Sequence, residues 1–244
     1  MKKFLVIGNP IEHSLSPTLH NYWIKSNGID AIYEKQKLDE GELEQVILQI
    51  RKKKIDGVNV TVPFKKVIIP FLDELTVEAE NTQSVNTLYL KDNKVIGHNT
   101  DIFGFETSME ISEYNVFNKE VLILGAGGVV PSIIFALNKM KASKIKISNR
   151  TKEKAENLKK LFKDIEIKEW GEVPNFDMII NATSLGLKKE DKINLDFSSN
   201  SKNKFFYDVI YNPIETNFLK IGKSLGNITS VSYTHLTLPT TPYV

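Results

Sequence analysis

Short apolar runs alternate with longer stretches of helical spacing along most of the chain, and this alternation limits the possible folds most strongly. Runs such as Phe4–Gly8 and Gly57–Val62 suit buried strands, whereas residues 40–54 and 151–163 carry apolar side chains three or four positions apart. Strand and helix in alternation predict a mostly parallel sheet with helices on both faces. The predicted fold class is therefore α/β.

The alternation also divides the chain into two units. We predict an N-terminal α/β unit over residues 1–103 and a C-terminal α/β unit over 104–226. Residues 227–244 form an atypical tail without Asp, Glu, Lys or Arg. This threonine-rich segment is either disordered or foreign sequence joined to a truncated gene, and the abrupt change in composition favours the second interpretation.

The composition excludes several classes of protein. The 244 residues include no cysteine, which excludes disulfides and thiolate metal sites and fits a reducing compartment. Four scattered histidines give no metal-ligand spacing, so we predict no metal site. A net charge of +2 with dispersed basic residues argues against a nucleic-acid surface, and no apolar run reaches membrane-spanning length. We expect a cytoplasmic protein that binds neither nucleic acid nor membrane.

A glycine-rich turn follows the first strand of the second unit, in LILGAGGVVPS. Gly125 and Gly127 allow a tight turn and a close approach of the backbone to a pyrophosphate, which the N-terminus of the next helix then meets. Val130 takes the place of the third glycine of the usual pattern. A purely structural turn is the alternative, but the position between strand and helix favours a dinucleotide site.

The end of the next predicted strand indicates which dinucleotide binds. NAD sites usually place an acidic residue there. This chain has Arg150 at that position, followed by Lys152 and Lys154. Such cations suit the 2′-phosphate of NADP(H), although they also suit a solvated helix start. We predict NADP(H) as the cofactor and residues 104–226 as a Rossmann-type NADP-binding unit.

Polar segments of the first unit hold further candidate residues, each with an ordinary alternative. Ser14 and Ser16 either cap a helix that starts at Pro17 or bind a ligand through their hydroxyls. Taken alone, Lys65 in NVTVPFKK is a surface lysine of a first helical turn, and Asp101 in GHNTD is a helix N-cap or first-turn acid. Their order along the chain changes this interpretation.

GNPIEHSLSPTLHN, NVTVPFKK, VNTLYL and GHNTD, followed by GAGG, NRT, NATSLG and DVIYNP, together resemble the shikimate dehydrogenase family over about residues 4–226. The resemblance implies reversible reduction of 3-dehydroshikimate to shikimate by NADPH, in chorismate and aromatic amino acid biosynthesis. It implies Lys65 and Asp101 as the catalytic pair, residues 1–103 as the substrate-binding unit, and an active site in the cleft between the two units. The substrate contacts that it implies come from Ser14, Ser16, Thr61, Lys65, Asn86, Asp101 and Tyr211. The implied cofactor contacts come from Gly125, Ala126, Gly127, Gly128, Val129, Asn149, Arg150, Thr151, Lys154, Thr183 and Val209.

The C-terminus departs from the family pattern. The family continues with a helix that carries a substrate-binding glutamine, whereas the last glutamine here is Gln83. Two alternatives therefore stand beside the main prediction: a quinate/shikimate dehydrogenase with relaxed cofactor use, and an inactive dinucleotide-binding fragment. The predicted assembly is a monomer or a homodimer.

Overall fold

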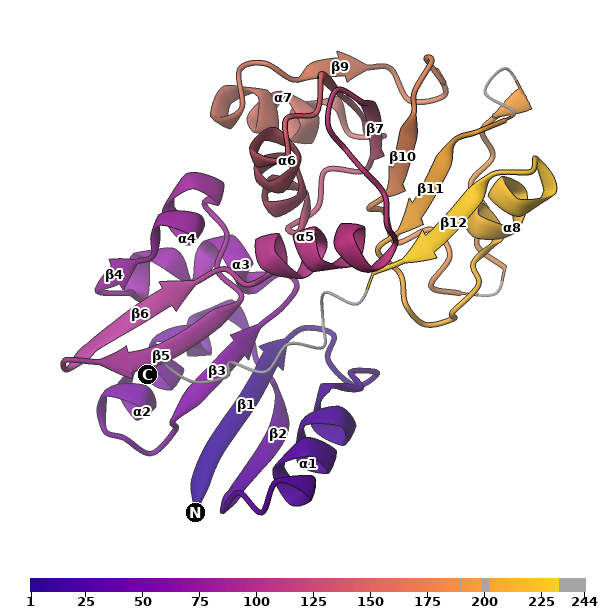
Figure 1. Cartoon of the computed structure of the whole chain (residues 1–244). Coiled ribbons are helices and arrows are strands. Elements are labelled where there is room, and N and C mark those ends of the chain that lie inside the picture. The colour runs from indigo at the N-terminus through magenta and orange to yellow at the C-terminus, as the bar shows by residue number, and fades with distance from the viewer. Residues whose placement is uncertain (189, 199–201, 233–244) are drawn as a thin grey trace. The chain divides into compact units, whose positions relative to one another are not determined.

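The computed structural model describes residues 1–188, 190–198 and 202–232, and contacts within the chain divide it into two units. The first unit comprises Met1–Asp101, and the second begins at Ile102. Each unit has a sheet of its own, and the ribbon in Figure 1 follows the chain through both. The division falls two residues before the predicted boundary at 103.

A mixed six-stranded sheet forms the first unit, in the order β2-β1-β3-β5-β6-β4. β1 runs parallel to β2 and β3, whereas β5 runs antiparallel to β3 and β6. The β5–β6 turn places Asp92 and Asn93 at positive φ, as a tight two-residue hairpin requires. The strands are β1 (Lys2–Gly8), β2 (Ala31–Lys37), β3 (Gly57–Val60), β4 (Glu74–Leu75), β5 (Thr87–Lys91) and β6 (Lys94–His98).

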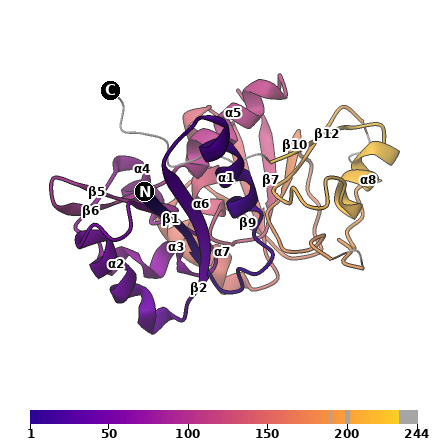
Figure 2. The same ribbon diagram turned by 90° about the horizontal axis from the view of Figure 1, so that it is seen from below.

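Helices pack on both faces of this sheet. Leu5 and Ile7 enter a core shared with α2, whereas Val6 packs with Ile24 of α1, because successive side chains of a strand point to opposite faces. Figure 2 shows α2 and α1 on opposite sides of β1 and β2. The helices and 3₁₀ turns are α1 (Ser16–Ser26), η1 (Glu40–Glu42), α2 (Leu43–Arg51), α3 (Phe64–Val67), η2 (Ile69–Phe71) and α4 (Val77–Thr82).

The second unit contains a parallel six-stranded sheet in the order β12-β11-β10-β7-β8-β9. Counted from β7 as the first strand and read from β9, this is the doubly wound order 3-2-1-4-5-6 of dinucleotide-binding folds. The order reverses between β7 and β10, whose carboxyl ends mark the usual ligand position. The strands are β7 (Glu120–Leu124), β8 (Lys144–Ser148), β9 (Glu166–Lys168), β10 (Met178–Asn181), β11 (Phe205–Asp208) and β12 (Ile228–Val231).

Both faces of the second sheet are also covered. Val121 and Ile123 of β7 enter one core with α5, α6 and α7, while Leu122 and Leu124 enter another with α8. In Figure 1, α6 and α7 lie on one side of the strands and α8 on the other. These helices are α5 (Asp101–Ile111), α6 (Val130–Lys139), α7 (Lys152–Leu161) and α8 (Asn217–Ser224).

The α/β fold class is confirmed, and the details differ from the prediction in two places. The first sheet is mixed, because the hairpin turn reverses the chain at β5 and β6. Ile228–Val231, which the sequence assigned to an atypical tail, form β12 and pair with β11. The second unit therefore extends past the predicted end at 226. Residues 233–244, the rest of that tail, lie outside the described residues.

Candidate active site

Lys65 and Asp101 form a buried ion pair in the first unit. Lys65 lies in the short helix α3, which follows Pro63, and Asp101 is the first residue of α5. Lys65 Nζ lies 2.6 Å from Asp101 Oδ2, and the two side chains are 7% and 1% exposed. An ammonium and a carboxylate are costly to bury unless they are paired. The burial rules out the surface-lysine alternative.

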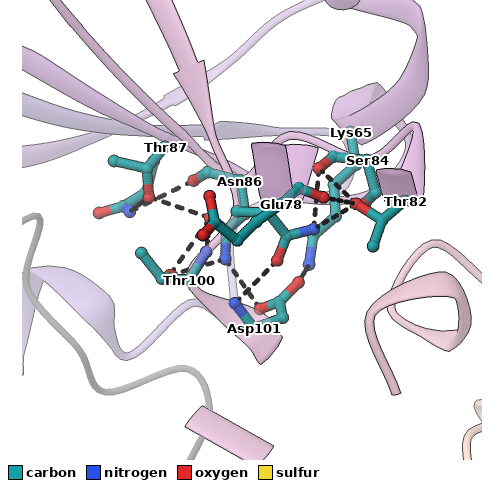
Figure 3. A network of polar contacts seen from close by, with 10 residues as sticks. Lys65, Glu78, Thr82, Ser84, Asn86, Thr87, Thr100 and Asp101 are labelled. Atoms are coloured by element: carbon teal, nitrogen blue, oxygen red, sulfur yellow. Dashed lines mark hydrogen bonds and ion pairs between the residues drawn. The ribbon is translucent and has the colours of Figure 1, made fainter. Parts of the chain in front are cut away.

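Asn86 binds the other carboxylate oxygen of Asp101. Asn86 Nδ2 donates to Asp101 Oδ1 at 2.8 Å, and the Thr100 backbone N–H donates to Asn86 Oδ1 at 3.0 Å. The Asp101 backbone N–H donates to Asn99 Oδ1 at 2.9 Å, and Asn99 Nδ2 donates to the Ser84 carbonyl at 2.8 Å. Figure 3 shows this network around Asp101. Neighbouring side chains therefore fix the orientation of the carboxylate.

Asn99 and Thr100 were not among the residues predicted from the sequence. Asn99 is buried, and Thr100 Oγ1 accepts from Asn86 Nδ2 at 2.9 Å. Both lie in GHNTD beside Asp101. Several consecutive polar residues at the end of a strand were the signal that could have identified them.

The loop before α1 presents half-buried hydroxyls. α1 begins at Ser16, one residue before the predicted start, and the Ser16 backbone N–H donates to Ser14 Oγ at 3.3 Å. Ser14 therefore supports the local turn, but the N-cap of α1 is Leu15, without a side-chain cap hydrogen bond, so neither serine caps the helix as the first alternative held. Among the described residues, the hydroxyls of Ser16 and of Thr61 have no hydrogen-bond partner. Both hydroxyls are free to bind a ligand.

The turn after β7 fits a dinucleotide phosphate. Gly125 has a φ of +109°, and a Cβ there would lie 2.6 Å from the carbonyl oxygen of Ala182, so the fold itself requires this glycine. Gly127 differs, because a Cβ there would meet the chain only at an ordinary 3.8 Å. Ala126, Gly128 and Val129 complete the turn before α6. The open space at Gly127 fits close approach of a ligand to the backbone.

Two cations near the end of β8 have no acidic partner among the described residues. Arg150 and Lys154 are exposed and have no ion-pair or hydrogen-bond partner among the residues described, whereas Lys152 pairs with Glu169 at 2.6 Å. Asn149 Nδ2 donates to the Thr151 carbonyl at 2.7 Å and shapes the turn between them. A guanidinium in this position suits a phosphate better than a ribose hydroxyl.

Asp208 and Asn181 organise the carboxyl ends of β11 and β10, and the sequence analysis did not single them out. Asn181 Nδ2 donates to Asp208 Oδ1 at 3.0 Å, while Asn181 Oδ1 accepts from the Thr183 hydroxyl at 2.7 Å. Thr216, the N-cap of α8, donates to Asp208 Oδ2 at 2.6 Å. Burial raises the pKa of Asp208 to about 6. A polar residue that ends an apolar strand was the available signal.

Two further predicted residues follow these strand ends. The backbone N–H of Val209 donates to the Asn181 carbonyl at 3.0 Å, which places Val209 at the end of β10. Tyr211 lies half-buried in the loop after β11, and burial raises the pKa of its hydroxyl. Tyr211 belongs to the second unit, whereas the other predicted substrate contacts belong to the first.

The described residues contain no group of three or more His, Cys, Asp or Glu placed to hold a metal ion. No helix in the described ranges has both the length and the apolar character needed to span a bilayer.

Together, the strand order, the glycine turn and the unpaired Arg150 define a Rossmann-type unit, which the chain joins to an α/β unit with a buried acid–base pair. Such a protein is a dinucleotide-dependent oxidoreductase. Family profiles agree: the shikimate dehydrogenase substrate binding domain matches residues 6–88, and shikimate / quinate 5-dehydrogenase matches residues 107–217. The chain belongs to the shikimate dehydrogenase family.

Individual relatives cover most of the chain. It is 66% identical over 228 residues to a shikimate dehydrogenase (NADP(+)) of Pelagibacter ubique, with 93% of this chain and 86% of the relative aligned. The crystal structure of shikimate dehydrogenase from Aquifex aeolicus has a TM-score of 0.86 at 36% identity, covering 97% and 88% of the two chains. The Thermus thermophilus enzyme in complex with NADP(H) and shikimate has a TM-score of 0.87 at 28% identity, covering 97% and 89%.

Proposed function

We propose that the chain catalyses the reversible NADPH-dependent reduction of 3-dehydroshikimate to shikimate, a step toward chorismate and the aromatic amino acids. The observation that carries the proposal is the buried pair of Lys65 and Asp101, held at 2.6 Å within a family of shikimate dehydrogenases. The 66% identical relative is named as the NADP(+) enzyme of this class.

The first unit binds the substrate. The hydroxyls of Ser14 and Ser16, at the start of α1, hold the carboxylate without introducing a competing full charge. Thr61 and Asn86 bond to the hydroxyl groups of the ring, and the half-buried Tyr211 of the second unit supplies a further hydroxyl contact. The free hydroxyls of Ser16 and Thr61 support this assignment.

The second unit binds NADP(H). The turn around Gly127 and the N-terminus of α6 hold the pyrophosphate, and Arg150 with Lys154 holds the 2′-phosphate. Asn149, Thr151, Thr183 and Val209 line the remaining cofactor site. Bound NADPH supplies the hydride that adds to the ketone carbon of the substrate.

Lys65 supplies the proton that the ketone oxygen requires. Its ammonium stabilises the negative charge that develops on this oxygen as the carbonyl is reduced, and it donates a proton as the hydroxyl forms. Asp101 orients the ammonium through the 2.6 Å ion pair and accepts or relays a proton in the reverse direction. In shikimate oxidation the same two groups remove the hydroxyl proton.

The alternatives raised by the sequence are not favoured. A quinate/shikimate dehydrogenase with relaxed cofactor use fits poorly with the unpaired Arg150, and an inactive fragment fits poorly with an intact ion pair. We further propose a cytoplasmic location, in keeping with the absence of cysteine, and a monomer or homodimer.

NADPH oxidation at 340 nm with 3-dehydroshikimate tests the proposal. We expect turnover with NADPH and the reverse reaction with shikimate and NADP⁺. Quinate and NADH serve as the competing substrate and cofactor. Absence of turnover in a folded sample that binds NADPH would contradict the proposed function.

A further inference from the structure

Tyr33 of β2 packs against and hydrogen-bonds to α1. This helix begins at Ser16, and we call residues 14–16 at its start the serine loop. Its ring is 1% exposed and stacks on His20 of α1, with ring centroids 4.1 Å apart and an interplanar angle of 13°. The side-chain amide of Asn21, also in α1, donates to the Tyr33 carbonyl at 2.7 Å and accepts from the Tyr33 N–H at 3.0 Å. Tyr33 therefore follows the position of α1, whose first residue is Ser16.

The hydroxyl of Tyr33 reaches the next polar group across the sheet. It donates to Asn59 Oδ1 of β3 at 2.7 Å. Asn59 Nδ2 in turn donates to the backbone carbonyl of Asn86 and to Thr87 Oγ1, each at 3.3 Å. A carbonyl oxygen only accepts hydrogen bonds, so the Asn59 amide must direct its nitrogen there and its oxygen to the tyrosine.

The remaining hydrogen bonds continue in one direction to the catalytic pair. Asn86 Oδ1 carries no hydrogen, so the Thr87 hydroxyl donates to it, at 3.0 Å. Asn86 Nδ2 then donates to Asp101 Oδ1 at 2.8 Å, and Lys65 binds the other oxygen at 2.6 Å. Figure 3 shows the segment from Thr87 through Asn86 to Asp101. From Tyr33 onward, every group donates toward the Asp101 carboxylate.

We propose that Tyr33 is a positioning residue for the reaction: its hydroxyl, through Asn59, Thr87 and Asn86, fixes the orientation of the Asp101 carboxylate and thereby of the Lys65 ammonium. The inference rests on the proposed function, and it adds a residue that touches neither substrate nor cofactor. Because Tyr33 is also attached to α1, it couples the serine loop to the acid–base pair.

Burial makes this chain of hydrogen bonds effective. Tyr33, Thr87, Asn86 and Asp101 are buried and Asn59 is half-buried, so water has little access to replace a lost donor. In a low-dielectric interior each hydrogen bond polarises the next, which strengthens the terminal bond to the carboxylate. Burial also raises the pKa of the Tyr33 hydroxyl above its ordinary value, so this hydroxyl remains a donor at neutral pH.

Tyr33→Phe removes the first donor and keeps the ring. A buried hydrogen bond contributes roughly 0.5–1.5 kcal/mol, so we expect kcat to fall about 3- to 10-fold, with the dissociation constant of NADPH unchanged. The matched control is Tyr114→Phe, whose hydroxyl donates to the Asp177 carbonyl at 3.3 Å in the second unit and should leave kcat unchanged. Equal kcat values for wild type and Tyr33→Phe would overturn the proposal.

Two substitutions of Thr87 distinguish the loss of a hydrogen bond from the loss of packing. They test the inference even where Tyr33→Phe folds poorly. Thr87→Val keeps the shape and removes the hydroxyl, so kcat should fall at least as far as in Tyr33→Phe. Thr87→Ser keeps the hydroxyl and should retain kcat within about twofold. Equal losses in both variants would assign the effect to packing and overturn the proposal.

A measurement that needs no turnover separates this inference from the proposed function. The side-chain amide signal of Asn86, assigned in ¹⁵N NMR spectra by its absence in Asn86→Asp, should shift in Tyr33→Phe and not in Tyr114→Phe. A wild-type protein without turnover whose signal shifts in this way contradicts the proposed function and supports the chain of hydrogen bonds. An unmoved signal overturns the inference, whatever the turnover.

Discussion

At Lys65, a positive charge lies 2.6 Å from a carboxylate and away from water. In the proposed mechanism this charge meets the reacting oxygen only as negative charge develops there, so Lys65→Ala should lower kcat by about 10²–10⁴-fold. NADPH binding, measured by fluorescence titration, should change little, because the proposed cofactor contacts lie in the second unit. Lys66→Ala, at the exposed neighbour in α3, is the matched control.

Removing Lys65 alone leaves Asp101 buried without its cation, which by itself destabilises a fold by roughly 3–5 kcal/mol. Lys65→Ala/Asp101→Asn removes both charges and so separates folding from chemistry. Its kcat should be close to that of the worse single variant, since the two groups act as one unit. Near wild-type turnover in a folded Lys65→Ala sample would contradict the catalytic assignment.

Arg150 gives a second prediction at the scale of one residue. Its guanidinium has no partner among the described residues, so we expect it to give a cofactor phosphate an undivided charge-assisted contact. Arg150→Ala should weaken NADP⁺ binding by about 1.5–3 kcal/mol and leave NAD⁺ binding nearly unchanged. Calorimetric titration of both cofactors tests this, with Lys152→Ala as the control because Lys152 pairs with Glu169. Equal losses for NADP⁺ and NAD⁺ would refute the assignment to the phosphate.

At the scale of elements, we expect the two glycines of the turn between β7 and α6 to serve different purposes, Gly125 for folding and Gly127 for cofactor binding. Gly125→Ala should destabilise the protein by at least about 2 kcal/mol, because its φ is +109° and the new Cβ would meet the Ala182 carbonyl oxygen at 2.6 Å. Gly127→Ala should leave the free energy of unfolding close to wild type, since its nearest contact would be 3.8 Å. It should instead weaken NADPH binding. Similar unfolding curves for the two variants would contradict this division.

The sequence predicted elements better than it predicted their arrangement. Periodicity located β1, β7 and α6, because buried faces impose a spacing on the chain. It could not give the pairing of β3 with β5 or of β12 with β11, because each depends on a partner distant along the chain. Local pattern contains no information on either.

The candidate site shows the same division. Motif order predicted that Lys65, Asn86 and Asp101 share one site, and the structure brings the three side chains into contact. Tyr33 and Asp208 were not predicted, because their importance lies in hydrogen bonds to residues far along the chain: Tyr33 to Asn59, and Asp208 to Asn181. Such contacts become visible only when the sheet is assembled.

At the scale of the whole molecule, each unit contains a buried titratable group, and the two groups make stability depend on pH in opposite directions. Burial lowers the pKa of His20 in the first unit to about 4 and raises that of Asp208 in the second to about 6. The stability contributed by neutral His20 is present above its unfolded pKa of about 6.5 and is lost as the pH falls toward 4. The stability contributed by neutral Asp208 is present below about pH 4 and is lost as the pH rises to 6.

The sequence offers a separate probe for each unit. Its two tryptophans are Trp23 in the first unit, whose ring centroid lies 5.6 Å from that of His20, and Trp170 in the second, which packs on the core around α8. Single-tryptophan variants therefore report the unfolding of each unit by fluorescence. This matters because a chain of two units need not unfold in one step.

We predict that lowering the pH from 6.5 to 4.5 destabilises the first unit relative to the second. His20→Phe should remove the loss of stability that Trp23 fluorescence reports. As the pH falls, the free energy of unfolding of this variant should increase relative to wild type by roughly 1–3 kcal/mol. The exchange is feasible because His20 Nδ1 is buried without a hydrogen-bond partner among the described residues.

Asp208→Asn should show the opposite trend in Trp170 fluorescence. As the pH rises from 4 to 6, the free energy of unfolding of this variant should increase relative to wild type by up to about 3 kcal/mol. Exposed carboxylates titrate equally in variant and wild type, so they cancel in each comparison. Parallel stability curves for a variant and wild type over this range would show that the buried group does not titrate as expected.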